Sequence, residues 1–148
     1  MSVQVVFFDL GDTLVTVNPK AWVRNAKLLL AKLVQQGFRL GIISNTGNLP
    51  DRVAILAILP TDFDLNVFEP GLVLFSSEVG FAKPDPNIFK MAVSQSGVAA
   101  NRCLYCSENI VETLVAQHVG MMGLRIQPPP GNDLDELAQR IAEFHAQI

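Results

Sequence analysis

Four short segments that lie far apart in the sequence carry side chains capable of phosphoryl chemistry. They contain Asp9, then Ser44 with Asn45, then Lys83, and last Glu108 with Glu112 one helical turn further on. A carboxylate can attack phosphorus and form an aspartyl-phosphate intermediate, which splits one difficult displacement into two. Because this sets an anion against an anion, the reaction needs positive charge nearby, which a lysine and a Mg²⁺ ion can supply. The residue types therefore indicate phosphoryl transfer.

Mg²⁺ prefers one or two carboxylates together with waters and substrate oxygens. Asp9, Glu108 and Glu112 are the candidate carboxylates, and Ser44 with the backbone amides beside it is a candidate for holding the oxygens of the transferring group. Each residue also has a plainer explanation when taken alone. Ser44 fits ordinary turn chemistry, and the two glutamates fit the first turn of a helix. The case for a site depends on the four segments together.

The elements that would position these residues are short apolar runs alternating with amphipathic helical patterns. We expect strands over 3–8, 39–43, 72–75, 102–106 and 121–126. Helices are expected from Asn18-Pro19, as N-cap and first helical residue, to Gly37, and over 51–59, 85–97 and 110–118. The first of these helices would carry Trp22, Ala26, Leu29, Leu30 and Leu33 on one face. A terminal helix is expected from the spacing of Leu134, Leu137, Ala138, Ile141 and Phe144.

Strands that are apolar on both faces and separated by helices predict a parallel sheet covered on two sides. The fold class expected is therefore α/β: a doubly wound, Rossmann-like three-layer sandwich with about five parallel strands, forming one domain over residues 1–148. In such sheets ligands bind at the carboxyl ends of the strands. Asp9 and Ser44 directly follow the first two predicted strands, so this rule places them together.

Composition limits the remaining possibilities. Hydrophobic residues make up 49% of the 148 residues and charged residues 17%, which excludes intrinsic disorder. The net charge of −3 argues against a nucleic-acid partner, and the longest apolar run, 53–59, is far too short for a membrane span. With two cysteines and no export signal, a cytoplasmic location is expected. The low charged fraction hints at a homo-oligomer.

The four segments resemble the motifs of the haloacid-dehalogenase-like (HAD) superfamily, whose members are mostly Mg²⁺-dependent phosphatases. Phe-Phe-Asp-Leu-Gly-Asp-Thr-Leu-Val resembles the first motif, and Ile-Ile-Ser-Asn-Thr resembles the second. Gly-Phe-Ala-Lys-Pro-Asp-Pro-Asn-Ile-Phe is similar to the third motif of the phosphoglycolate-phosphatase-like branch. The resemblance covers roughly residues 3–126, in the right order and spacing.

The resemblance implies a role for each matching residue. Asp9 would be the nucleophile and a metal ligand, and the backbone carbonyl of Gly11 would coordinate Mg²⁺. Ser44, Asn45 and Lys83 would bind the phosphoryl group of a phosphorylated substrate, with Lys83 also neutralising Asp9. Glu108 and Glu112 would complete the metal site from the fourth motif.

Two departures from the family pattern bear on activity. Gly11 stands where family phosphatases place an aspartate that protonates the leaving group and later activates water. Acid–base assistance is worth about 10²–10⁴-fold in rate, so slow turnover is expected. Asp12 lies one position late, on a segment expected to be extended, which would point its side chain away. The fourth motif is Ser107-Glu108 in place of an aspartate pair. The alternative is a catalytically impaired phosphate-binding or regulatory protein with the same fold.

The spacing between motifs predicts a capless member of this family. Between Asp9 and Ser44, and between Ser44 and Lys83, there is no room for the cap domain that closes over small substrates in many relatives. An open site of this kind suits a bulky or macromolecular phosphorylated substrate, or a second subunit acting as a lid. A haloacid dehalogenase, which normally needs a cap, and a phospho-accepting receiver domain fit less well.

Three further side-chain patterns are interpreted as structural. Asp85 is expected to be the N-cap of its helix. Cys103 and Cys106 are three apart on a strand, so their thiols should point to opposite faces and form no shared site. His118 and His145 are expected to be surface or packing residues.

Overall fold

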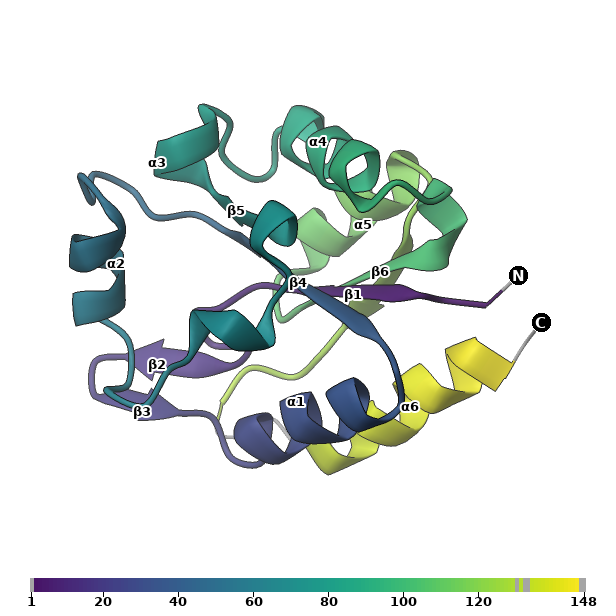
Figure 1. The fold of residues 1–148 in the computed structure, drawn as a ribbon, viewed down its shortest axis with the longest axis horizontal. Helices are drawn as coiled ribbons and strands as arrows, with labels where there is room; N and C mark the ends of the chain where they lie inside the picture. The colour runs from purple at the N-terminus through teal and green to yellow at the C-terminus, as the bar shows by residue number, and fades with distance from the viewer. Residues whose placement is uncertain (1, 130, 132–133, 147–148) are drawn as a thin grey trace.

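A five-stranded parallel sheet forms the centre of the molecule (Figure 1). The computed structural model describes residues 2–129, 131 and 134–146. The strands are β1 (Val5–Phe8), β4 (Arg39–Ser44), β5 (Val73–Phe75), β6 (Cys103–Ser107) and β7 (Met122–Arg125), in the order β5-β4-β1-β6-β7. Every strand pair in this sheet is parallel. This confirms the five predicted strands, each to within a few residues.

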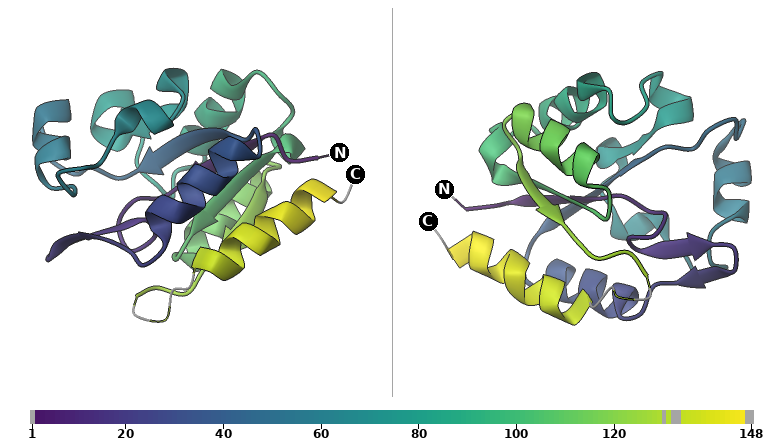
Figure 2. Two further views of the ribbon diagram at one scale, coloured as in Figure 1. Left: turned by 60° about the horizontal axis from the view of Figure 1, so that its bottom comes forward. Right: turned by 180° about the vertical axis from the view of Figure 1, so that it is seen from behind.

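Helices cover both faces of the sheet (Figures 1 and 2). On one face α1 (Ala26–Gln35) lies beside α6 (Leu134–Ala146), and on the other lie α4 (Pro86–Ser96) and α5 (Ile110–His118). A separate cluster of buried apolar side chains fills each of the two interfaces. The doubly wound three-layer α/β fold is therefore confirmed.

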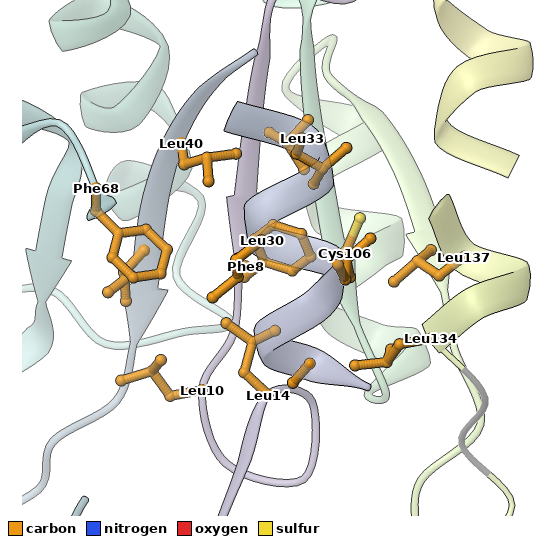
Figure 3. Packing of buried hydrophobic residues seen from close by; sticks show 14 of the residues in the cluster. Phe8, Leu10, Leu14, Leu30, Leu33, Leu40, Phe68, Cys106, Leu134 and Leu137 are labelled. Atoms are coloured by element: carbon orange, nitrogen blue, oxygen red, sulfur yellow. The ribbon is translucent and has the colours of Figure 1, made fainter. Parts of the chain in front are cut away.

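The terminal helix packs on the sheet of its own chain. Leu134, Leu137 and Ile141 of α6 are buried in the cluster that also holds Leu30 and Leu33 of α1 (Figure 3). Ala138 packs against the same cluster as a half-buried residue. The side chain of Phe144, predicted for the same face, lies outside the described residues. Burial of this stripe explains why the segment forms a helix here.

At Gly41, in the middle of β4, the backbone lies very close to Phe7 and Leu72. A Cβ atom at this position would lie 2.6 Å from the ring of Phe7 in β1 and 2.7 Å from the backbone oxygen of Leu72. Only glycine leaves room for this approach. This close approach fixes how tightly β1 and β4 pack beside the segment that carries Asp9.

The prediction of one long helix from Asn18-Pro19 to Gly37 is wrong in its first part. Residues 15–22 form an antiparallel hairpin of β2 (Val15–Val17) and β3 (Lys20–Trp22), and Asn18-Pro19 is the two-residue turn between them. Asn and Pro favour turns as well as helix starts, and the flanking β-branched residues favour strands. The hydroxyl of Thr16 donates to the carbonyl of Pro19 at 2.6 Å and supports the turn. Trp22 therefore lies on a strand, and the helix begins at Ala26.

The intervals between the motifs hold short elements only. Between Asp9 and Ser44 lie the hairpin and α1, and between Ser44 and Lys83 lie α2 (Arg52–Ala57), β5, α3 (Ser76–Val79) and two 3-10 turns. No cap domain is inserted in either interval, as the spacing predicted. The hairpin and α2 both lie at the end of the molecule where β1 finishes (Figures 1 and 2). None of the described helices is both long and apolar enough to cross a lipid bilayer.

Three smaller predictions are confirmed. Asp85 caps α4 by accepting a hydrogen bond from the backbone of Asn87 at 2.8 Å. Cys103 and Cys106 are free thiols buried in the two opposite clusters, so they form no shared site. His118 is exposed at the end of α5, whereas the side chain of His145 is not among those described.

Candidate active site

Strand register brings the four segments together at one edge of the sheet. Phe8, the last residue of β1, pairs with Ile42 of β4 on one side and with Cys106 of β6 on the other. Asp9 follows directly, and its backbone N–H donates to the carbonyl of Cys106 at 3.1 Å. Ser44 and Ser107 end the neighbouring strands at the same edge. The convergence predicted from the sequence is therefore present.

Asp9 is 7% exposed and its two carboxylate oxygens have different surroundings. Oδ1 accepts from the backbone N–H of Leu10 at 2.9 Å and from Nζ of Lys83 at 2.8 Å. Oδ2 accepts, among the described residues, two longer contacts of 3.4 Å from the hydroxyls of Thr13 and Ser107. Oδ1 is therefore held by two short hydrogen bonds, and Oδ2 is the oxygen more available to a ligand.

Lys83 is buried to 5% exposure, and its ammonium contacts three acceptors. Besides Asp9, Nζ lies 2.9 Å from Oε1 of Glu112 and donates to the hydroxyl of Tyr105 at 3.0 Å. Tyr105 in turn donates to Oε1 of Glu112 at 2.6 Å. The three donor hydrogens of an ammonium are thus matched by three oxygens. The carboxylate of Glu112 is therefore held by Lys83 and Tyr105. Glu112 lies in the first turn of α5, four residues after Glu108.

Electrostatics at this edge are dominated by excess negative charge. Burial raises the pKa of the Asp9 carboxyl, and the Lys83 ammonium opposes that rise. The pKa of Glu108 is also raised, first by burial and then by the carboxylates of Asp9, Glu112 and Asp12. Burial, followed by the carboxylates of Asp9 and Glu112, raises the pKa of Tyr105 well above its usual range, so this side chain stays a neutral phenol that can donate. The Lys83 ammonium contacts the carboxylates of Asp9 and Glu112, while Glu108 and Asp12 add further negative charge at this edge.

The segment after β4 is fastened to the segment that carries Lys83. The side-chain amide of Asn45 donates to the backbone oxygen of Lys83 at 2.9 Å and accepts from its backbone N–H at 2.8 Å. The hydroxyl of Thr46 contacts that of Ser77 in α3 at 2.6 Å. Ser44 is 6% exposed at the end of β4. The side chain of Asn45 is thus engaged structurally, which leaves its backbone for contact with a ligand.

The chain turns sharply after Asp9. Asp12 has a left-handed backbone with φ 60°, and its N–H donates to the carbonyl of Val15 at 2.7 Å. The expectation of an extended segment at Asp12 is therefore wrong, because this hydrogen bond closes a turn before β2. Asp12 is exposed and adds to the negative charge around Glu108. At Gly11 a Cβ atom would meet nothing within 4 Å, so the position of the missing aspartate is open space.

An apolar cavity of about 140 Å³ lies beside Gly11 and Ser44. One wall comes from Val15 and Val17 of the hairpin and another from α2 and the residues that follow it, including Ile55 and Ile58. Asn45 and Thr46 border it on the side of β4. The cavity therefore adjoins the predicted phosphoryl-binding residues.

Comparisons with known proteins give structural likeness only. No family model matches the chain, and no curated protein matches its sequence. An uncharacterised protein of Listeria monocytogenes has a TM-score of 0.77 at 20% identity, covering 96% of this chain and 98% of that one. A HAD family enzyme of Bacteroides thetaiotaomicron, in complex with magnesium and inorganic phosphate, has a TM-score of 0.71 at 15% identity over 91% and 98% of the two chains. A HAD-superfamily hydrolase of Geobacter sulfurreducens has a TM-score of 0.69 at 14% identity over 86% and 91%.

The fold is that of the HAD-like hydrolases. The likeness extends over most of the chain and agrees with the motif order and with the five-stranded parallel sheet. The narrower expectation of the phosphoglycolate-phosphatase-like branch rests on the sequence motif alone.

The carboxylates of Asp9 and Glu108 at the carboxyl edge of the sheet fit a divalent cation, because they are negatively charged oxygen ligands. The pKa of Glu108 is raised partly by neighbouring carboxylates, a repulsion that a cation would relieve. Within the part of the chain that the structure describes, no three His, Cys, Asp or Glu side chains converge as an all-protein metal cage. Mg²⁺ does not need one, because it usually keeps several waters and binds one or two carboxylates.

Sequence reasoning missed Tyr105 as a site residue. A tyrosine in an apolar strand is usually a core residue, and Tyr105 is indeed fully buried, with its ring edge-on to Phe89 at 5.0 Å. Its hydroxyl nevertheless reaches Lys83 and Glu112. The available signal was the alternation of side chains along a strand. Tyr105 lies on the same face of β6 as Ser107, and its partner in β1, Phe7, lies on the same face as Asp9.

Proposed function

We propose that this protein is a Mg²⁺-dependent phosphohydrolase that acts through an aspartyl-phosphate on Asp9, with slow turnover. The observation that carries the proposal is the buried contact of 2.8 Å between Asp9 and Lys83 at the carboxyl edge of the sheet, next to Ser44. A buried ion pair is costly to desolvate and is weak evidence for stability. Groups of this kind cluster at functional sites.

The chain's own residues account for most of the proposed chemistry. Lys83 and the Leu10 amide hold Oδ1 of Asp9, which directs the less engaged Oδ2 toward phosphorus. Ser44 and the backbone beside Asn45 would bind the phosphoryl oxygens, and Lys83 would offset the charge that builds up on them. Water then attacks the aspartyl-phosphate, breaking the bond between Asp9 and phosphorus and releasing inorganic phosphate.

Asp9, Glu108 and the backbone carbonyl of Gly11 would hold Mg²⁺. When bound, the ion supplies positive charge where one anion must approach another. Glu112 is also a candidate ligand from the sequence, but its Oε1 is shared by Lys83 and Tyr105. We therefore assign Glu112 to orienting Lys83.

The direct test measures phosphate release from a generic aryl phosphate with Mg²⁺, comparing the wild type with Asp9→Asn. We expect the variant to fall to the background rate and chelation of Mg²⁺ to abolish the wild-type rate. Asp85→Asn is the matched control, because asparagine still caps α4 and the residue lies outside the contacts of Asp9. Equal rates for the wild type and Asp9→Asn would remove Asp9 from the mechanism.

The second candidate is a phosphate-binding or regulatory protein that has lost turnover. It is favoured by Gly11, which supplies no carboxyl group for acid–base work. Binding of inorganic phosphate with Mg²⁺ by calorimetry, without release of phosphate from any ester, would support this function. Multiple turnover would exclude it.

The expected substrate is a phosphorylated compound, and the open edge suits a bulky or macromolecular one. A second copy of the chain serving as a lid remains part of this proposal. Sedimentation equilibrium would measure whether the protein associates at working concentrations.

A further inference from the structure

We infer that the cavity beside Gly11 selects phosphate esters with an apolar aryl leaving group. The inference rests on the proposed phosphohydrolase function and specifies the substrate class of that site. Two independent observations carry it: the size and lining of the cavity, and the lack of an acid at position 11.

The lining matches an apolar ring. The walls contributed by Val15, Leu49, Ile55 and Ile58 are aliphatic, and none of the cavity-lining residues in the described chain is charged. A volume of about 140 Å³ is close to the roughly 150 Å³ of an engineered apolar cavity that binds benzene. The polar members of the lining, Ser44, Asn45 and Thr46, lie on the side of β4, so a sugar or a charged chain placed between the hairpin and α2 would lose its hydration without gaining polar partners.

The position of the cavity suits a leaving group. It is bordered by Ser44 and Asn45, which are predicted to hold the phosphoryl oxygens, and by Gly11. An ester bound with its phosphoryl group at Ser44 would extend its organic part along Gly11 between the hairpin and α2. Because Gly11 has no side chain, the entrance is not obstructed on that side.

The absence of an acid at position 11 also favours aryl esters over alkyl esters. Attack by Asp9 on phosphorus breaks the bond to the ester oxygen, whose electron pair must leave with that oxygen. Without an acid at position 11 the oxygen departs as an anion and takes its proton from water. A phenol has a pKa of about 10, whereas an alcohol, like water, is a far weaker acid and so a far poorer leaving group. An aryl ester therefore reacts without the proton donor that an alkyl ester requires.

Three substrates of matched design separate the two effects. Phenyl and cyclohexyl phosphate carry apolar rings of similar size, and glycerol phosphate carries a polar chain. We expect similar KM values for the two ring esters but a kcat about 10²-fold or more lower for cyclohexyl phosphate. Glycerol phosphate should have both a higher KM and a low kcat. A phosphotyrosine peptide tests whether an aryl ester borne by a macromolecule is used equally well.

Two variants on the α2 side test the cavity itself. Ile58→Trp places a large side chain in the cavity, whereas Val53→Trp adds the same side chain at a position that is 79% exposed and outside the lining. We expect the KM for phenyl phosphate to rise about tenfold in Ile58→Trp and to stay at the wild-type value in Val53→Trp. Circular dichroism of both variants checks that the fold is kept.

A binding measurement keeps the inference testable apart from turnover. By calorimetry with Mg²⁺ present, phenylphosphonate should bind at least about tenfold more tightly than methylphosphonate, and the preference should vanish in Ile58→Trp. Equal affinity for the two phosphonates would overturn the inference. So would hydrolysis of glycerol phosphate as fast as phenyl phosphate, an outcome that leaves the phosphohydrolase intact. Failure to hydrolyse any ester would instead count against the proposed function.

Discussion

Asp9 and Lys83 form the centre of a small network of hydrogen bonds and ion pairs that also includes Tyr105 and Glu112. Lys83 contacts Asp9, Glu112 and Tyr105, and Tyr105 donates back to Glu112. Such networks in a low-dielectric setting fix geometry, and each unmade bond in them is costly. The arrangement holds Oδ1 of Asp9 in place and leaves Oδ2, among the described residues, with the two longer contacts.

Gly11→Asp should increase the rate of phosphate release. A Cβ atom fits at Gly11 without contacts, and a carboxyl there would supply the acid and base that the site lacks. The gain expected is about 10²–10⁴-fold in kcat, larger for alkyl than for aryl esters. Gly11→Asn is the matched control, because its amide has similar size but cannot exchange a proton. An equal effect of both substitutions would contradict the acid–base explanation.

Tyr105→Phe should lower both stability and activity. The substitution keeps the ring against Phe89 but removes the 2.6 Å donor to half-buried Glu112 and one acceptor of the buried Lys83 ammonium, at a cost of about 1–3 kcal/mol. Denaturant unfolding measures the loss, and kcat should fall because Lys83 is less well oriented. Glu112→Gln retains an acceptor oxygen and should lose less stability. Wild-type kcat in Tyr105→Phe would remove the tyrosine from the site.

At the scale of elements, the helices and strands of the sandwich followed from periodicity and caps. Asp85-Pro86 before α4 is an N-terminal signal that the structure bears out, since Asp85 accepts a hydrogen bond from the following turn. Asn109 caps α5 in the same way. Asn18-Pro19 carries the same type of signal and yet forms a hairpin turn. The difference lies in tertiary context, because Val15 is buried in the core cluster and β2 pairs with β3.

The site was predictable where side chains follow directly from strand ends, and not where they depend on packing across elements. Asp9 and Ser44 lie at the ends of neighbouring strands, as the carboxyl-edge rule predicts, and Lys83 reaches Asp9 from the loop before α4. The engagement of Asn45 with the backbone of Lys83 depends on how two loops approach each other. The left-handed turn at Asp12 depends on a hydrogen bond to Val15. Neither leaves a periodic signal in the sequence.

Gly41→Ala should destabilise the sheet without touching the site. The added methyl would lie 2.6 Å from the Phe7 ring and 2.7 Å from the Leu72 backbone oxygen, so β4 must move away from its neighbours. Overpacking of this kind costs about 1–3 kcal/mol, seen as a lower denaturant midpoint. Gly71→Ala is the control, since a Cβ atom there meets nothing within 4 Å. An unchanged denaturant midpoint in Gly41→Ala would contradict this prediction, because it would show that the strands can move apart without loss of stability.

At the scale of the whole molecule, Arg39 ties three parts of the fold together. Its guanidinium at the start of β4 donates to both carboxylate oxygens of Glu69, at 2.9 and 2.6 Å, and to the backbone oxygen of Ser96 at the end of α4. These hydrogen bonds lower the pKa of Glu69 below its ordinary value of 4.5. The pair lies at the opposite end of β4 from Ser44.

The Arg39–Glu69 pair predicts a pH dependence of global stability. Because the folded-state pKa of Glu69 is lowered, its contribution is present above pH 4.5 and is lost as the pH falls through the folded value. Both side chains are partly exposed, so the contribution is about 0.2–1 kcal/mol. The free-energy gap between wild type and Glu69→Gln, from urea unfolding, should therefore be largest at pH 7 and close on acidification. A gap that stays constant down to pH 3 would contradict this.

The two hydrogen bonds between the side chain of Asn45 and the backbone of Lys83 divide the candidate active site into two parts that differ in how freely their residues can change. On one side, the turn after β4 and the lysine-bearing loop are clamped together, so neither can shift without carrying the other. On the other side, the hairpin and α2 contribute only aliphatic surface to the cavity. Mutation can reshape that second wall, and with it the choice of ester, while the charged machinery keeps its alignment.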